Sequence, residues 1–279
     1  MNDPRPLTAG VLGNPIGQSK SPLLFRHWFD VLGIEGNYSP YLVAPEEFER
    51  VIRGLQAGGL RGVNCTIPHK EAALAIADDV SSMAQAIGAA NTLTFRADGT
   101  IHADNTDGYG FIENLMAGAP TWRADAGPTL MLGAGGAARA AVYALIDAGC
   151  PEIRLSNRTR ARAEELAVGL DGPISVIDWD ERASAADGAA LIANSTGLGM
   201  IGQQPLAMDL TAAPAGTIVT DMVYNPLETD LLAAARAREM TTVDGLGMLL
   251  HQARPGFQRW FDRDPTVTEN LRNAVLERA

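Results

Sequence analysis

The chain is poor in cysteine and in positive charge, and each shortage excludes certain kinds of site or binding partner. Its two cysteines, Cys65 and Cys150, cannot form a disulfide framework or a cysteine-rich metal site. Its 22 lysine and arginine residues are outnumbered by 33 aspartate and glutamate residues, which gives a net charge of −11. A chain with this charge repels polyanions, so we expect no general binding to nucleic acid or to anionic membranes.

Long apolar runs and targeting signals are also missing. No stretch approaches the roughly 18 consecutive apolar residues that a membrane span needs. The first ten residues, MNDPRPLTAG, lack the basic region and apolar segment of a signal peptide. The four histidines (27, 69, 102 and 251) have no spacing typical of metal ligands. We therefore expect a cytoplasmic protein that binds no metal.

The length of 279 residues suits two domains. Short strands alternate with helices in the first part, where we expect Ser21 to be the N-cap of a helix that ends at Gly33. Turn residues cluster between 118 and 128, which predicts a domain linker. The expected strands of this part are 9–12, 38–43, 62–67 and a hairpin of 91–95 with 101–103, and the expected helices are 21–32, 45–57 and 68–77.

Strands and helices also alternate in the second part, and this pattern predicts a parallel, doubly wound sheet. Two helices should close the chain, and Pro255-Gly256 should kink or split the first of them. The expected strands are 129–132, 152–156, 174–177, 190–193, 217–221 and 241–243, and the closing helices are 246–261 and 266–278.

A glycine-rich turn follows the strand at 129–132 and opens a helix. Residues 133–138 fit G-x-G-x-x-[GA], a weak pattern alone that the flanking strand and helix strengthen. The small residues let a pyrophosphate approach the backbone and the helix N-terminus. The alternative is a glycine-rich turn in a domain that binds no nucleotide. The predicted dinucleotide-binding residues are Gly133, Ala134, Gly135, Gly136 and Ala137.

The next strand favours a phosphorylated dinucleotide. An NAD site usually has an acidic residue about 20 positions after the motif, but this chain has SNRTRAR at 156–162. Guanidinium groups suit a 2′-phosphate, so NADP(H) is predicted over NAD(H). Arg160 also fits a solvated helix face, paired with Glu164 or Glu165. The predicted phosphate ligands are Arg158 and Thr159, with Arg162 or Arg160 as a clamp.

Polar residues gather where the strands of the first part end. Ligands of open α/β sheets bind at the carboxyl ends of the strands. A lysine, an aspartate, amides and hydroxyls at such an edge predict a polyol site that can transfer a proton. The segments are GQSKSP (17–22), NCTIPHK (64–70), Asn91-Thr92 and DNTDG (104–108).

Eight segments together resemble the shikimate dehydrogenase family, which comprises NADP-linked enzymes of aromatic amino-acid biosynthesis. They follow the family's order along nearly the whole chain, and only the GAGGAA pattern is shared with many unrelated dehydrogenases. The resemblance implies a two-domain α/β fold. Residues 1–110 and 246–279 would form the substrate domain, to which the C-terminal helices return, and 111–245 a Rossmann-type NADP domain. The segments are GNPIGQSKSP (13–22), GVNCTIPHK (62–70), GAANTL (88–93), DNTDG (104–108), GAGGAARA (133–140), NRTRAR (157–162), DMVYNPLETDLL (221–232) and DGLGMLLHQA (244–253).

The resemblance also implies roles for individual residues. Lys70 and Asp107 match the family's catalytic pair. The positions matching substrate-binding residues are Ser19, Ser21 and Tyr224 near a carboxylate, and Asn64, Thr66, Asn91 and Gln252 around ring hydroxyls. The positions matching cofactor-binding residues are Asn157, Arg158, Thr159 and Arg162 at the 2′-phosphate, and Met222 and Gly245 at the nicotinamide.

These implications describe an NADP-dependent enzyme that interconverts 3-dehydroshikimate and shikimate. The nicotinamide takes a hydride, and Lys70 transfers the alcohol proton while Asp107 orients and shares it. Two alternatives stay open, namely a quinate/shikimate dehydrogenase that uses NAD and a non-catalytic NADP-binding regulator of the same fold. Either a monomer or a homodimer fits the sequence.

Simpler interpretations compete for several residues. Cys65 is expected in the core, because Asn64 and Thr66 point to the opposite face of the strand. His69 is expected at the surface, because neighbouring helix residues do not share a face. On base rates, Met222 and Tyr224 fit the core better than a site.

Overall fold

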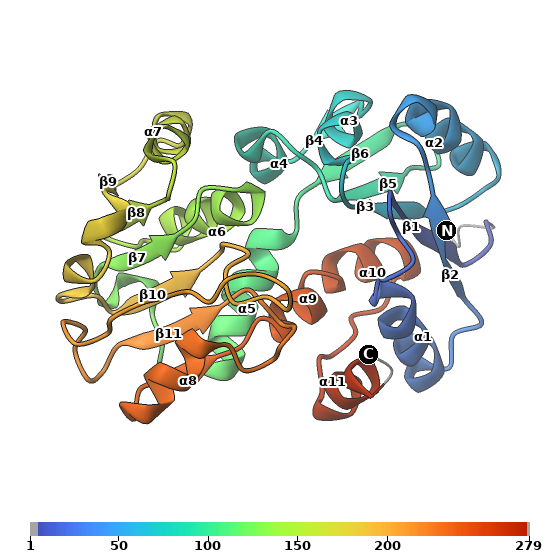
Figure 1. Ribbon diagram of the computed structural model, residues 1–279. Coiled ribbons are helices and arrows are strands. Elements are labelled where there is room, and N and C mark those ends of the chain that lie inside the picture. Colours follow the sequence, from blue (N-terminus) through green and yellow to red (C-terminus); the bar gives the residue numbers. More distant parts are fainter. Residues whose placement is uncertain (1–4, 278–279) are drawn as a thin grey trace. The chain divides into compact units, whose positions relative to one another are not determined.

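The computed structural model describes residues 5–277, and their contacts divide the chain into two compact units (Figure 1). One unit combines Met1–Thr106 with Gln252–Ala279, and the other is Asp107–His251. Each unit is built on its own six-stranded sheet, so the predicted α/β class with two sheets is confirmed. No helix within the described residues is long and apolar enough to cross a membrane.

The sheet of the first unit is mixed, with the strand order β2-β1-β3-β5-β6-β4. Strand β1 is parallel to β2 and β3, whereas β5 runs antiparallel to β3 and β6. The carboxyl ends of β1, β3 and β6 therefore share one edge with the start of β5. The strands are β1 (Thr8–Gly13), β2 (Asn37–Leu42), β3 (Gly62–Cys65), β4 (Asp79–Val80), β5 (Thr92–Phe95) and β6 (Ile101–Asp104).

Helices cover both faces of this sheet. On one face an apolar core that includes Val63 and Leu93 packs against Phe48 and Ile52. On the other face, aromatic rings of α1 and α10 pack against one another in tilted and edge-to-face contacts, and a side chain at Gly62 would collide with the ring of Trp260. The helices are α1 (Ser21–Leu32), the 3-10 turn η1 (Pro45–Glu47), α2 (Phe48–Ala57), α3 (Lys70–Ala75), α4 (Ser82–Ile87), α10 (Arg254–Phe261) and α11 (Glu269–Leu276).

Helix α1 covers the predicted residues 21–32, but the prediction that Ser21 is its N-cap is wrong. Lys20 occupies the N-cap position, and Ser21 is the first helical residue instead of the cap. The hydroxyl of Ser19 accepts a hydrogen bond from the backbone N–H of Ser21 at 3.4 Å, which satisfies a donor at the helix start. Gly33 ends the helix in the left-handed conformation, with φ of 63°, as predicted.

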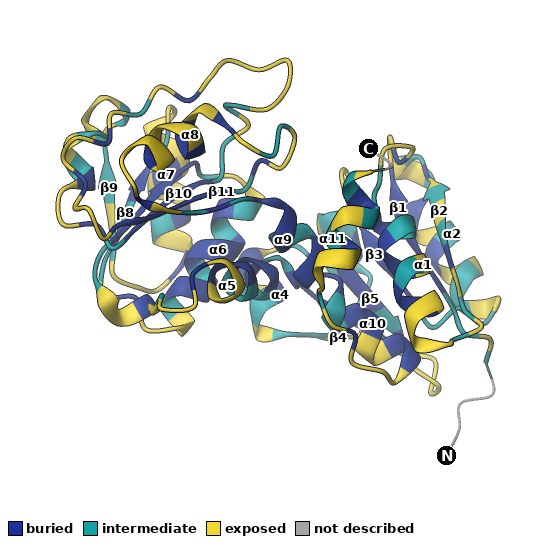
Figure 2. Cartoon of the chain, turned by 90° about the horizontal axis from the view of Figure 1, so that it is seen from below, coloured by how far each residue is buried: buried dark blue, intermediate teal, exposed yellow. Residues whose placement is uncertain are grey.

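The sheet of the second unit is fully parallel, in the order β12-β11-β10-β7-β8-β9, which confirms the predicted doubly wound sheet. Its four central strands are largely buried, with α8 on one side and α5 and α6 on the other (Figure 2). The strands are β7 (Thr129–Leu132), β8 (Ile153–Ser156), β9 (Ile174–Ile177), β10 (Leu191–Asn194), β11 (Ile218–Asp221) and β12 (Thr241–Val243). The helices are α5 (Asp107–Gly118), α6 (Gly136–Asp147), α7 (Arg160–Gly169), α8 (Asp230–Ala237) and α9 (Leu246–His251), with 3-10 turns η2 (Ala124–Ala126), η3 (Trp179–Glu181) and η4 (Ser184–Ala186).

Two predictions about chain breaks need correction or refinement. The turn-rich stretch at 118–128 is not a linker between the units, because α5 precedes it and packs against α6 and α9 inside the second unit. The predicted helix at 246–261 is split, but the break lies at Gln252-Ala253, before Pro255. Pro255 instead takes an early position in α10, where a missing N–H costs nothing.

A buried carboxylate ties β6 to α10 within the first unit. Asp104 accepts a hydrogen bond from Ser81 at 2.6 Å and forms an ion pair with Arg259 at 2.6 Å. Burial alone would raise the pKa of Asp104, but the Ser81 hydroxyl and the Arg259 charge together hold it below its usual value. Because the folded-state pKa is lowered, this carboxylate stabilises the fold above the unfolded pKa of about 4.

We expect Asp104→Asn to lower the free energy of unfolding by about 2 kcal/mol at pH 7, since it leaves Arg259 without its partner. The difference in free energy of unfolding between the variant and wild type should shrink as the pH falls through the folded-state pKa of Asp104, because wild-type Asp104 also becomes protonated there. Urea unfolding at pH 7 and pH 3 measures both effects. Asp79→Asn is the control, because Asp79 pairs with Arg96 in solvent, and it should stay near wild type. An equal loss in both variants would contradict this role for Asp104.

Candidate active site

The polar residues predicted for the first unit meet at one edge of its sheet. Asn64 is the third residue of β3 and Thr66 follows that strand, while Asn91 precedes β5. Strand pairing sets Asn64 opposite Thr92, and the backbone N–H of Cys65 bonds the carbonyl of Asn91 at 2.8 Å. Ser19 and Ser21 follow β1, the parallel neighbour of β3, and so reach the same edge. Ser21, Asn64 and Asn91 are all buried.

A hydrogen-bond network connects three of these predicted residues. Asn64 Nδ2 donates to the carbonyl of Asn91 at 3.2 Å, and Asn91 Oδ1 accepts from the backbone N–H of Thr106 at 3.0 Å. Thr106 Oγ1 in turn bonds Gln252 Oε1 at 3.4 Å. The structure thus gathers Asn64, Asn91 and Gln252 in one polar cluster.

Two further members of this cluster were missed as site residues by the sequence reasoning. Tyr38 donates from its hydroxyl to Asn64 Oδ1 at 2.7 Å. Thr92 accepts from Asn64 Nδ2 at 3.0 Å and donates to Asn91 Oδ1 at 2.8 Å. Thr92 lies in a recognised polar segment, but nothing in the local sequence around Tyr38 indicates where its hydroxyl points.

Lys70 is the first residue of α3, and its carbonyl accepts from the backbone N–H of Ala90 at 2.8 Å. The predicted surface position of its neighbour His69 is wrong, because His69 is only 1% exposed. The His69 ring stacks on Phe48 at 4.8 Å, and its Nε2 bonds the Val43 carbonyl at 2.9 Å. His69 precedes the helix, so the helical spacing that suggested a surface role does not apply to it.

Cys65 lies in the core, as predicted, with 2% of its surface exposed. Burial raises the pKa of its thiol to about 12, and the nearby charge of Lys70 opposes that rise. A thiol in this state is a poor nucleophile, so Cys65 is a packing residue. Among the described residues, no three histidine, cysteine, aspartate or glutamate side chains gather in an arrangement that could hold a metal ion.

The glycine-rich turn of the second unit leads from β7 into α6. Gly133 has φ of 110°, and a Cβ there would lie 2.5 Å from Ser195 Oγ, so only glycine fits. Space above Gly135 and Gly136 is open, because a Cβ on either would meet nothing within 4 Å. Helix α6 has no side-chain cap at its N-terminus. Its first N–H groups therefore suit the pyrophosphate of a dinucleotide.

The four arginines after β7 divide into two pairs with different roles. Arg154 is held by Glu152 and by the carbonyl of Ala185, at 3.0 and 2.9 Å. Arg160 pairs with Glu164 at 2.8 Å and with Asp178 at 2.6 Å, so the solvated-face interpretation of Arg160 is confirmed. Arg158 and Arg162 are exposed, and their guanidinium groups have no ion-pair partner anywhere in residues 5–277.

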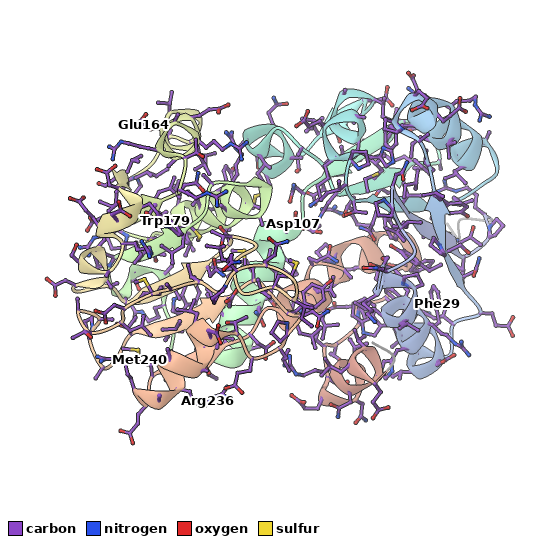
Figure 3. The ribbon with its side chains drawn as sticks, in the orientation of Figure 1. Phe29, Asp107, Glu164, Trp179, Arg236 and Met240 are labelled. Carbon is purple, nitrogen blue, oxygen red and sulfur yellow. The ribbon has the colours of Figure 1, made fainter. Side chains whose placement is uncertain are left out.

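Three further predicted residues lie in the second unit. Met222 follows β11 and directly contacts Gly245, where a Cβ would collide with the Met222 carbonyl. Tyr224 is 39% exposed, so the core interpretation is wrong for it. Asp107 is the first residue of α5 (Figure 3). Lys70 belongs to the first unit and Asp107 to the second.

A buried carboxylate that the sequence reasoning overlooked supports the Met222 segment. Asp221 accepts from Asn194 Nδ2 at 2.9 Å, from the Val223 N–H at 2.9 Å and from the Thr229 hydroxyl at 2.7 Å. Burial raises the pKa of Asp221, and these three donors oppose the rise. The contacts fix the chain on either side of Met222.

Comparisons with known proteins agree on one family. Residues 11–93 match the family model described as the shikimate dehydrogenase substrate binding domain, and residues 123–208 match the one described as shikimate / quinate 5-dehydrogenase. The NADP(+) shikimate dehydrogenase of Paramagnetospirillum magneticum is 54% identical to this chain, over 96% of this chain and 97% of its own length.

Solved structures agree with these matches. The shikimate 5-dehydrogenase of Thermus thermophilus, solved with NADP(H) and shikimate, superposes with a TM-score of 0.86 at 34% identity, covering 98% of this chain and 100% of that one. The quinate dehydrogenase of Corynebacterium glutamicum, solved with NAD, has a TM-score of 0.90 at 27% identity, covering 98% and 99%.

Proposed function

Because this chain belongs to the shikimate dehydrogenase family, we propose that it catalyses the reversible, NADP-dependent interconversion of 3-dehydroshikimate and shikimate. The polar cluster of the first unit is the observation that carries the proposal. Buried amides and hydroxyls of Asn64, Asn91 and Thr92 form one connected network. Such a network matches a small polyol, since each ring hydroxyl needs a fixed donor or acceptor.

The proposed substrate contacts follow from the chemistry of each side chain. The hydroxyls of Ser19 and Ser21, at the start of α1, are suited to hold the carboxylate, because helix N-termini favour anions. Tyr224 is assigned to the same carboxylate. The amides of Asn64, Asn91 and Gln252 and the hydroxyl of Thr66 are assigned to the ring hydroxyls.

The second unit is proposed to bind NADP. When bound, the cofactor supplies the hydride acceptor for alcohol oxidation and the hydride donor for ketone reduction. The N-terminus of α6 would hold the pyrophosphate through the turn at 133–137, and Arg158 and Arg162 the 2′-phosphate with Asn157 and Thr159. Met222 and Gly245 are assigned to the nicotinamide end.

The proposed proton transfer uses Lys70 and Asp107. Oxidation of a secondary alcohol releases a proton from oxygen together with a hydride from carbon, so a base must take the proton. Lys70 is assigned to bond the reacting oxygen and Asp107 to orient and share the proton.

An NAD-dependent quinate/shikimate dehydrogenase is the second candidate, since a quinate dehydrogenase solved with NAD shares the fold. The exposed, unpartnered Arg158 and Arg162 favour NADP instead, because a cationic pair at this position is suited to a 2′-phosphate.

Initial rates of NADP+ reduction with shikimate and with quinate, repeated with NAD+, separate these candidates. We expect kcat/KM to be highest for shikimate with NADP+. Replacing shikimate by quinate, or NADP+ by NAD+, should each lower kcat/KM by at least about tenfold. A preference for NAD+ with quinate would overturn the proposal in favour of the second candidate. NADPH binding without turnover of either acid would indicate a non-catalytic protein.

A further inference from the structure

Each hydrogen bond of the polar cluster runs in a fixed direction from donor to acceptor, and two backbone groups determine that direction. The N–H of Thr106 can only donate, so the side-chain atom of Asn91 that it bonds at 3.0 Å is the oxygen. The carbonyl of Asn91 can only accept, so the Asn64 atom that it bonds at 3.2 Å is the nitrogen. The orientation of both amides is thus set by the main chain.

The two hydroxyls of the cluster must then follow the same direction. Thr92 accepts from Asn64 Nδ2 and donates to Asn91 Oδ1. Tyr38 faces Asn64 Oδ1 and must donate to it. The result is a one-way chain of hydrogen bonds that runs from Tyr38 through Asn64 and Thr92 to Asn91, an arrangement in which each bond strengthens the next.

This chain limits what each amide can offer to a ligand. Both Asn64 Nδ2 hydrogens are used, by the Asn91 carbonyl and by Thr92, so a ligand hydroxyl can bond the Asn64 side chain only by donating to Oδ1. Asn91 Oδ1 already accepts from the Thr92 hydroxyl and from the N–H of Thr106, and these two bonds use both of its lone pairs.

Tyr38 is held firmly enough to fix the position of the Asn64 side chain. Its ring is stacked on Phe25, with the ring centres 3.7 Å apart and the planes 14° from parallel, and lies 6.4 Å from the Trp260 ring. Only 7% of Tyr38 is exposed. Burial raises the pKa of its hydroxyl well above 10, so the hydroxyl keeps the proton that it donates.

We propose that Tyr38 is a specificity-determining positioning residue: it fixes Asn64 Oδ1, which the main chain already orients as an acceptor, at the place where that atom accepts a hydrogen bond from one hydroxyl of a bound polyol. This inference rests on the proposed function, because the polyol is taken to be shikimate. The hydroxyl concerned is one of the two ring hydroxyls that the reaction leaves unoxidised.

Tyr38→Phe tests the inference, since it removes the hydroxyl and keeps the stacked ring. We expect KM for shikimate to rise about tenfold, the equivalent of one hydrogen bond, and kcat to stay within about twofold because Tyr38 does not act on the reacting atoms. Tyr41→Phe is the matched control on the same strand, since no described residue hydrogen-bonds the Tyr41 hydroxyl. Its KM should stay at the wild-type value.

Substrate analogues supply the readout that a merely structural role would not change. One ring hydroxyl of the substrate donates to Asn64 Oδ1. Wild type should discriminate against an analogue in which this hydroxyl is replaced by hydrogen. It should discriminate equally against one in which it is replaced by fluorine, because fluorine cannot donate a hydrogen bond. Tyr38→Phe and Asn64→Ala should each reduce that discrimination about tenfold and leave discrimination at the other hydroxyl intact. The double variant should be no worse than Asn64→Ala.

The outcomes separate this inference from the proposed function. Wild-type turnover of shikimate with unchanged KM and discrimination in Tyr38→Phe would overturn the role of Tyr38 alone. Full activity with the analogue that carries fluorine in place of the hydroxyl bonded to Asn64 would also overturn the role of Tyr38, since that result would require Asn64 to donate a hydrogen bond. Failure of wild type to oxidise shikimate would overturn the proposed function and this inference together.

Discussion

Lys70→Ala is expected to lower kcat by about 10³-fold and to leave the Kd for NADPH within about twofold, because a lost general acid–base group typically costs 10²–10⁴-fold. The side chain is proposed to act on the substrate proton and not on the cofactor. Alanine preserves the backbone bond between the Lys70 carbonyl and the N–H of Ala90, so the start of α3 should remain folded. Single-turnover rates and NADPH fluorescence titration measure the two quantities.

Three variants make this result specific. Lys70→Arg should also be slow, because a guanidinium holds its proton and cannot return it. Glu71→Ala, at the next and exposed position of α3, should be as fast as wild type. If Lys70 and Asp107 work as one unit, Lys70→Ala/Asp107→Asn should be no slower than the slower single variant. A near-normal kcat for Lys70→Ala would refute the proposed role.

The second unit could be predicted closely because its signals are local. Apolar runs bounded by glycine or proline gave strands such as β7 and β9 at the predicted residues. The φ of 110° at Gly133 explains why the motif needs glycine at its first position. In a parallel sheet the motif's place after the first strand already determines which edge it occupies.

In the first unit, local sequence signals predict some site residues but not those whose positions depend on distant parts of the chain. Residues that follow strand ends, such as Asn64 and Asn91, could be expected at one edge. Tyr38 could not, because its approach to Asn64 depends on the pairing of β1 with both β2 and β3, which sets Tyr38 opposite Ala9. His69 was misplaced for a related reason, since its partner Phe48 comes from a distant helix.

Residues distant in the sequence also determine which of the four arginines are paired within the protein. The sequence showed four guanidinium groups near one predicted phosphate, and charge alone could not rank them. Asp178, which follows β9, engages Arg160, while the carbonyl of Ala185 engages Arg154. These partners come from the next αβ unit, and they leave Arg158 and Arg162 as the pair available to a ligand.

Arg158→Ala is accordingly expected to raise KM for NADPH by about 30-fold and to leave KM for NADH nearly unchanged. Hydrogen bonds to a charged group contribute about 1.5–3 kcal/mol, which is the range of this effect. Arg160→Ala is the matched control two residues away, because Glu164 and Asp178 already pair with Arg160. Ratios of kcat/KM for NADPH and NADH in the three proteins measure the preference, and an equal change in both variants would contradict the assignment.

The effect should also depend on salt and on Arg162. The whole chain carries a net charge of −11, so its far field opposes a cofactor with an extra phosphate, and attraction must come from charges within a few ångströms. KM for NADPH should therefore rise with ionic strength in wild type and much less in Arg158→Ala/Arg162→Ala. If both arginines contact one phosphate, their effects on the NADPH-to-NADH ratio should be less than additive, since either loss weakens the hold of the other. An unchanged NADPH-to-NADH ratio in Arg162→Ala would instead place Arg162 away from the phosphate and leave Arg158 as its principal ligand.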